Sequence, residues 1–98
     1  MRNLRLFDLH CDTLFEVQKQ QKSLICGDLQ ISLERLSEYK RFCQVLAVWS
    51  DYRVSENTAY RRFFDARRKL LSELDTARER GFDVRLCVCD ADLCACEA

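Results

Sequence analysis

The sequence predicts an α/β fold in which strands and helices alternate along one chain. Two short runs rich in apolar residues, LRLFDL at 4–9 and QVLAVW at 44–49, are typical of the buried strands of a parallel sheet. Segments with the apolar spacing of helices follow each run, the longest of them over 55–80. This order of strand, helix, strand and helix favours parallel strands joined by helical crossovers.

The first half of the chain is predicted to hold one strand and two short helices. Residues 4–9 form the strand, and a helix follows over 13–21 with Thr13 as its N-cap. A loop containing Gly27 and Asp28, which favour turns, then leads to Ser32, the expected cap of a second short helix. The apolar residues of that helix recur at spacing three: Leu33, Leu36 and Tyr39.

The second half is predicted to hold a strand at 44–49, a long helix and a third strand, VRLCV, at 84–88. The long helix runs over 55–80, and Gly81 stands where a C-cap belongs. We expect one apolar stripe of this helix to be buried against the sheet: Ala59, Tyr60, Phe63, Phe64, Leu70, Leu71, Leu74 and Ala77. Three strands and one long helix can neither cover both faces of a parallel sheet nor close a barrel, so we expect an incomplete domain.

Composition excludes several classes of function. The chain has 98 residues, enough for one small domain, and its formal charge is zero, so no overall field attracts nucleic acid or an anionic membrane. The basic cluster RRFFDARRK fits a solvated helix face better than a nucleic-acid patch. No apolar stretch approaches the length of about 18 residues that spans a membrane, and no signal-peptide core is evident. We therefore expect a soluble, cytoplasmic protein with no nucleic-acid or membrane partner.

Seven cysteines are many for this length, and an odd number cannot all pair within the chain. In a reducing compartment we expect Cys11, Cys43 and Cys87 to be small buried hydrophobic residues. The tail also holds a C-x-C-x4-C-x-C array that could gather thiolates around zinc: Cys87, Cys89, Cys94 and Cys96. Because zinc sites usually use C-x2-C knuckles with turn residues, a strand followed by the start of a helix is favoured there.

The motif LFDLHCDTL holds the only histidine of the chain, with aspartates two positions away on both sides. In extended backbone, Asp8, His10 and Asp12 would project from the same face of the strand. Such a cluster is either solvated and hydrogen-bonded, or it holds a metal ion, since imidazole nitrogen and carboxylate oxygen are common zinc ligands. Spacing alone leaves both interpretations open, because zinc normally needs four ligands.

Three segments together, FDLHCDTL, DLQISLERL and QVLAVWSD ahead of a long helix, resemble the start of the membrane dipeptidase (renal dipeptidase-like) family of zinc metallopeptidases. The resemblance covers most of this chain but only about the first third of the family's usual length. Its most specific element is H-x-D at the end of the first strand, because many related hydrolases carry H-x-H there. It implies that residues 1–98 are the N-terminal portion of a single metallo-dipeptidase domain, a (β/α)8 TIM-type barrel.

The resemblance also implies the roles of the site residues. His10 and Asp12 would ligate one ion of a binuclear zinc site, and Asp8 would be a hydrogen-bonded support. The bridging glutamate and the later histidines of the family have no counterpart here, since Glu97 does not match that glutamate and His10 is the sole histidine. We therefore expect no catalytic residue within this chain and no activity of the chain alone. The intact protein would hydrolyse dipeptides, and self-association into a homo-oligomer stays open.

Two other classes of function compete with this hypothesis. The first is a small cysteine-rich module that holds a metal through the tail thiols. The second is a helical interaction protein without catalysis, which docks on a partner through apolar residues of the long helix: Tyr60, Phe63, Phe64, Leu70 and Leu74. The burial of that stripe against a sheet would explain the same residues without a partner.

Overall fold

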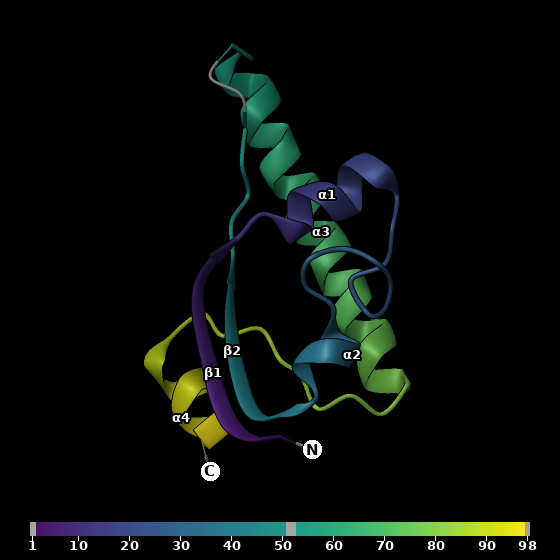
Figure 1. The fold of residues 1–98 in the computed structure, drawn as a ribbon. Coiled ribbons are helices and arrows are strands. Elements are labelled where there is room, and N and C mark those ends of the chain that lie inside the picture. The colour runs from purple at the N-terminus through teal and green to yellow at the C-terminus, as the bar shows by residue number, and fades with distance from the viewer. Residues whose placement is uncertain (1, 51–52, 98) are drawn as a thin grey trace.

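In the described part of the chain, the strands β1 (Arg2–Cys11) and β2 (Tyr39–Leu46) pair in parallel and form a two-stranded sheet. Figure 1 shows them side by side. The computed structural model describes residues 2–50 and 53–97. The strand predicted over 4–9 is confirmed and lies inside β1. The predicted α/β alternation with parallel strands is therefore present in a small sheet.

The second strand starts and ends earlier than the prediction of 44–49. β2 ends at Leu46, which lies opposite Cys11, the last residue of β1. The Ala47 N–H still donates to the Cys11 carbonyl at 3.0 Å, but β1 then gives way to a helix and offers no further partner. The bounds of β2 therefore depend on its neighbour, which the apolar run alone does not reveal.

The helices are α1 (Thr13–Gln20), α2 (Leu33–Leu36), α3 (Glu56–Glu79) and α4 (Asp90–Glu97). The cap expected at Ser32 is confirmed, because its hydroxyl accepts the N–H group of Arg35 at 3.3 Å. The structure adds a cap in front of α3, where the Ser55 hydroxyl accepts the N–H group of Thr58 at 3.2 Å. The prediction of Thr13 as an N-cap is wrong. Asp12 occupies that position without a side-chain hydrogen bond, and Thr13 is already helical and buried.

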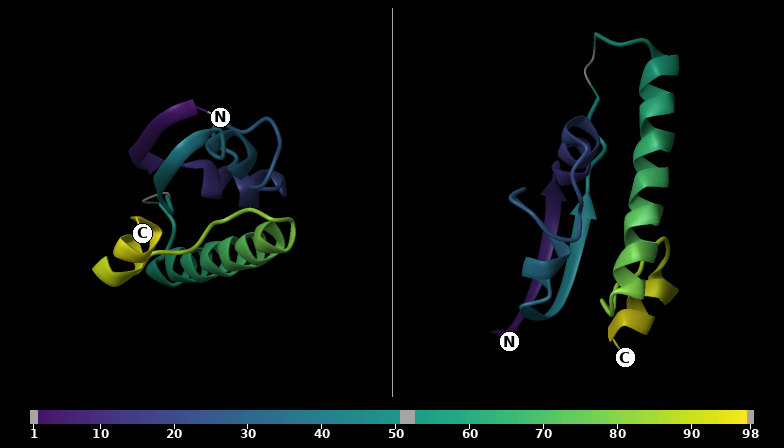
Figure 2. Two further views of the ribbon diagram at one scale, coloured as in Figure 1. Left: turned by 90° about the horizontal axis from the view of Figure 1, so that it is seen from below. Right: turned by 90° about the vertical axis from the view of Figure 1, so that its right-hand side faces the viewer.

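The core lies between the sheet and the helices, with α3 running alongside the sheet (Figure 2). α1, α2, α3 and the loop between α1 and α2 all contribute buried apolar side chains: Leu14, Val17, Leu24, Ile25, Leu29, Leu33, Leu36, Ala66, Leu70, Leu74 and Ala77. One carboxylate is buried with them. Glu73 pairs with Lys69 at 3.2 Å and accepts a hydrogen bond from the Ser23 hydroxyl at 3.3 Å, which ties the loop to α3.

The expected burial of the whole α3 stripe is correct for its C-terminal half only. Leu70, Leu74 and Ala77 are buried, whereas Tyr60, Phe63 and Phe64 are exposed. Figure 2 shows the reason, because the N-terminal half of α3 extends past the end of both strands. There is no sheet at that level for the aromatic side chains to cover.

The predicted third strand at 84–88 does not form, and this part of the sequence prediction is wrong. The segment carries no strand, and the sheet has only β1 and β2 among the residues that the structure describes. Val84 is buried and its carbonyl accepts a hydrogen bond from the Arg78 guanidinium, but Val88 is 77 % exposed. An apolar, β-branched run becomes a strand only where another strand offers its backbone, and none does here.

The helix predicted at the end of the chain is confirmed as α4. At its start the Asp92 carboxylate accepts the Val88 N–H at 2.9 Å, and this hydrogen bond holds the pKa of Asp92 below its usual value. Within 2–50 and 53–97, no helix is both long and apolar enough to cross a membrane.

We predict that the chain associates with itself through the uncovered face of its sheet. Phe7, Leu9 and Val45 are 60 %, 72 % and 43 % exposed, and apolar side chains left uncovered on one sheet favour association. Phe7→Lys should shift the chain toward the monomer in sedimentation velocity over a wide concentration range. Gln20→Lys, an exposed change on α1, is the matched control and should leave the association unchanged. A parent chain that stays monomeric at every concentration would disprove this prediction.

Candidate metal site

The two predicted metal ligands meet at the C-terminal end of β1. His10 is the penultimate residue of that strand, and Asp12 stands between β1 and α1. The Nε2 atom of His10 lies 3.3 Å from Oδ1 of Asp12. Their side chains are 67 % and 53 % exposed, so both donor atoms converge on one place that solvent reaches.

The expectation that Asp8, His10 and Asp12 share one strand face is wrong, because a register shift lies between Asp8 and Cys11. Asp8 lies opposite Gln44 and Cys11 lies opposite Leu46. Between these two pairs, β1 therefore contains one residue more than β2. An extra residue of this kind interrupts the alternation of side chains. Cys11 is buried in the place that strict alternation would give to His10, which is exposed instead.

Asp8 therefore contacts His10 through the backbone. Its Oδ1 accepts the His10 N–H at 3.4 Å, and its Oδ2 accepts a hydrogen bond from Nε2 of Gln44 at 2.9 Å. Both carboxylate oxygens are thus engaged on the protein side. Asp8 can position the strand end at His10, while Asp12 is the carboxylate that faces the imidazole.

Gln44 is the residue that sequence reasoning missed. Its amide group donates to Asp8 and to the Val45 carbonyl at 3.2 Å, while its buried Oε1 has no hydrogen-bond partner among the described residues. The signal for this pair is the parallel register that sets Gln44 beside Asp8. Two apolar runs in a sequence do not reveal that register.

The site offers two donors and no more from the described chain. Among the side chains that the structure describes, no three of His, Cys, Asp or Glu lie close enough together to hold a metal ion. Zinc normally takes four ligands, so the pair of His10 and Asp12 is half of a ligand set.

The tail thiols do not form a competing site with any other described donors. Cys89 and Cys94 are exposed free thiols, and Cys87 is half-buried. The fourth thiol of the predicted array, Cys96, lies outside the side chains that the structure describes. The expectation that buried cysteines fill apolar positions is confirmed for Cys11, whereas Cys43 and Cys87 are only half-buried.

We predict that Cys11→Ala lowers the stability of the fold and leaves the zinc affinity unchanged. Cys11 adjoins His10 in sequence but is only 7 % exposed, so removing its sulfur should cost about 1 kcal/mol of stability by loss of packing. The zinc affinity should stay that of the parent chain. Urea unfolding measures the first effect and calorimetric titration the second. Loss of zinc binding in this variant would make the thiol a ligand and contradict the assignment.

Comparison with protein-family models, curated proteins and solved structures found no match to this chain. The two exposed donors at a strand end are the feature with the clearest chemistry.

Proposed function

We propose that this chain supplies the first two zinc ligands, His10 and Asp12, of a metal-dependent dipeptidase. The observation that carries the proposal is the separation of 3.3 Å between the imidazole Nε2 and the carboxylate Oδ1 at the end of β1. Two ligand atoms at about 2.05 Å from a tetrahedral zinc ion are about 3.3 Å apart, so the spacing fits one ion. Catalytic residues of parallel α/β folds stand at this end of the strands.

The chemistry of each residue follows from its donor atom. His10 would bind zinc through neutral Nε2, and Asp12 would add a negatively charged oxygen. The hydrogen bond from the His10 backbone to Asp8, braced by Gln44, would hold the strand end in place. A zinc ion supplies the hydrolytic chemistry by lowering the pKa of a bound water and polarising the scissile carbonyl of a dipeptide. The remaining ligands of the binuclear centre would come from residues other than these two.

The surface of the sheet supports the proposal that residues 1–98 form the N-terminal portion of a (β/α)8 barrel. The helices cover one face of β1 and β2, and the other face leaves Phe7, Leu9 and Val45 exposed. In a closed barrel such side chains fill the interior. The exposed free thiols of Cys26, Cys89 and Cys94 agree with the proposed cytoplasmic location, where cysteines stay reduced.

The nucleotide sequence after the Ala98 codon tests the proposal, together with an assay of the protein that it encodes. We expect an in-frame apolar strand ending in glutamate within about 20 residues, the length that a helix and its loop require. The encoded protein should hydrolyse dipeptides with zinc and lose this activity when zinc is removed by a chelator. A stop codon at that point, with a stably folded chain of 98 residues, would contradict the proposal.

A further inference from the structure

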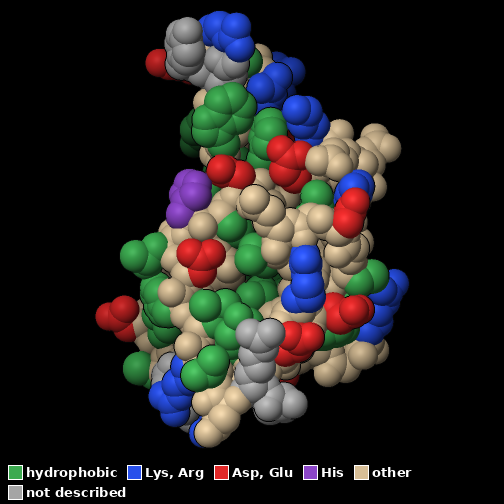
Figure 3. Space-filling model, in the orientation of Figure 1, with side chains coloured by type: hydrophobic (Ala, Val, Ile, Leu, Met, Phe, Trp, Pro, Cys, Tyr) green, Lys and Arg blue, Asp and Glu red, His purple; other side chains and the backbone are tan. Residues whose placement is uncertain are grey.

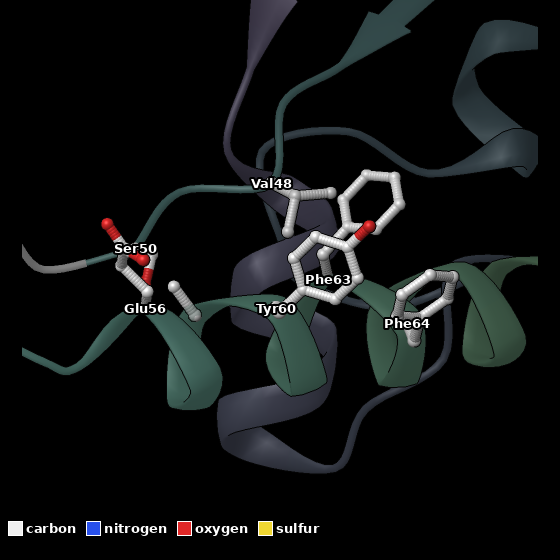
Figure 4. Close-up of a pocket in the computed structure, with 7 residues that line it drawn as sticks. Val48, Ser50, Glu56, Tyr60, Phe63 and Phe64 are labelled. Atoms are coloured by element: carbon white, nitrogen blue, oxygen red, sulfur yellow. The ribbon is translucent and has the colours of Figure 1, made fainter.

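The N-terminal half of α3 presents an apolar groove that the metal site does not use. The groove has a volume of about 470 Å³ and lies between α3 and the segment after β2 (Figure 4). Apolar and aromatic residues make up most of its lining, together with two polar residues: Val48, Ser50, Glu56, Ala59, Tyr60, Phe63 and Phe64. Tyr60, Phe63 and Phe64 are 68 %, 47 % and 45 % exposed.

The aromatic side chains of the groove already contact one another. The ring of Phe64 lies 5.1 Å from that of Tyr60 and 5.6 Å from that of Phe63, measured between centroids. Rings held by their neighbours lose little side-chain freedom when a partner covers them. The groove therefore offers a preformed apolar surface.

Arginines lie on the same part of α3 as this groove. Arg61, Arg62, Arg67 and Arg68 are all exposed, and Asp65 is the carboxylate among them, 3.8 Å from Arg68. Arg61 and Arg68 line a second hollow together with Tyr60 and Phe64, so cations lie directly beside the aromatic rings. Figure 3 shows Lys and Arg side chains beside apolar ones at this end of the molecule. Residues 56–68 carry these four arginines against Glu56 and Asp65, so this part of α3 is locally basic although the formal charge of the whole chain is zero.

We propose that the groove binds an amphipathic helix of a partner protein whose apolar face is flanked by Asp and Glu. Tyr60, Phe63 and Phe64 stand at the spacing i, i+3 and i+4 along one helix, which suits the side-by-side docking of a second helix. The arginines then meet carboxylates at the rim. Glu56 at the N-terminal end of the groove sets the direction, because the partner's uncharged or basic end would lie there.

Two other occupants fit this surface less well. A second copy of the chain docking through the same groove would bring arginines against arginines, which opposes association. Arginines and aromatic rings also attract a lipid bilayer, but a bilayer surface does not fill the groove between α3 and the segment after β2 as the side chains of a partner helix would. A partner helix satisfies the shape of the groove and its charge at once.

The test uses the 98-residue chain and three labelled synthetic peptides. The first is a helix with a leucine stripe flanked by glutamates, the second carries lysines in place of the glutamates, and the third is a scrambled version of the first. Fluorescence anisotropy should show saturable binding of the first peptide only. Equal binding of the first two peptides, or binding of none, would overturn the proposal.

Variants of the groove sharpen this test. Phe64→Ser should weaken binding of the acidic peptide by about tenfold or more, and Arg61→Glu by about fivefold. The bound peptide would bury the Phe64 ring, and such a ring contributes more affinity than a charge at the rim. Lys40→Glu on β2 is the matched charge control and should have no effect. Circular dichroism checks that each variant stays folded.

Two results would assign the groove to another occupant and overturn the proposal. The first is tighter binding to phosphatidylserine vesicles than to the acidic peptide. The second is a homodimer in sedimentation velocity that Phe64→Ser dissociates. The experiment does not involve His10 or Asp12, so its outcome is independent of the proposed dipeptidase activity.

Discussion

Zinc affinity is expected to fall by about tenfold or more when either His10 or Asp12 is replaced by alanine, because each change removes one of two first ligands. Both side chains are more than half exposed, so neither substitution removes core packing. In a protein that completes the ligand set, dipeptide hydrolysis should drop by orders of magnitude, since a weakly held metal no longer activates water. Calorimetric titration with zinc and metal analysis of the purified variants measure the loss.

The controls for this prediction come from the neighbouring residues. Cys11→Ala should keep the zinc affinity, and Asp8→Asn should reduce it less than Asp12→Ala, because Asp8 contacts His10 only through the backbone N–H. Full zinc binding by both His10→Ala and Asp12→Ala would show that the metal binds elsewhere.

The free energy of unfolding is expected to fall by about 2–5 kcal/mol in Leu14→Ala, the range for truncating a buried leucine. Leu14 is 1 % exposed and lies on α1, which packs against α3 inside the single apolar core. Truncation leaves a cavity where these two helices meet, and the surrounding side chains can only partly fill it. Urea unfolding followed by circular dichroism gives the difference.

Leu9→Ala is the matched control for Leu14→Ala. Leu9 is 72 % exposed, so the same truncation should change stability by less than about 0.5 kcal/mol. Equal losses in the two variants would mean that Leu14 does not lie in the core.

Elements that depend on local signals are predictable from this sequence. The bounds of α3 agree with the prediction of 55–80 to within one residue, because Ser55 caps its start and Gly81, with a φ of 94°, follows its end. Ser32 likewise marks the start of α2. Caps act within a few residues of the chain, so the sequence carries their information directly.

Elements that depend on distant partners are not predictable in this way. Residues 84–88 have the composition of a strand but no neighbouring strand to pair with. β2 begins at Tyr39 and includes the charged residues Lys40 and Arg41, so its first part lacks the apolar pattern that predicts a buried strand. The exposure of Phe63 and Phe64 has the same origin, since periodicity marks an apolar face without showing what covers it.

The candidate site likewise has features that the local sequence predicts and features that depend on distant partners. The spacing of His10 and Asp12 in the sequence predicts that they lie together, and they do, 3.3 Å apart. The register shift before Cys11 and the hydrogen bond from Gln44 to Asp8 arise from pairing with β2, which no local pattern encodes.

Nuclear magnetic resonance of the imidazole during a zinc titration tests the central claim most directly, because His10 is the only histidine of the chain. We predict a saturable change in the Nε2 resonance that requires about tenfold more zinc or more in Asp12→Ala and is unaltered in Cys94→Ala. An imidazole resonance that zinc leaves unchanged, while the chain binds zinc in a manner lost in Cys94→Ala, would contradict the account and assign the metal to the tail thiols.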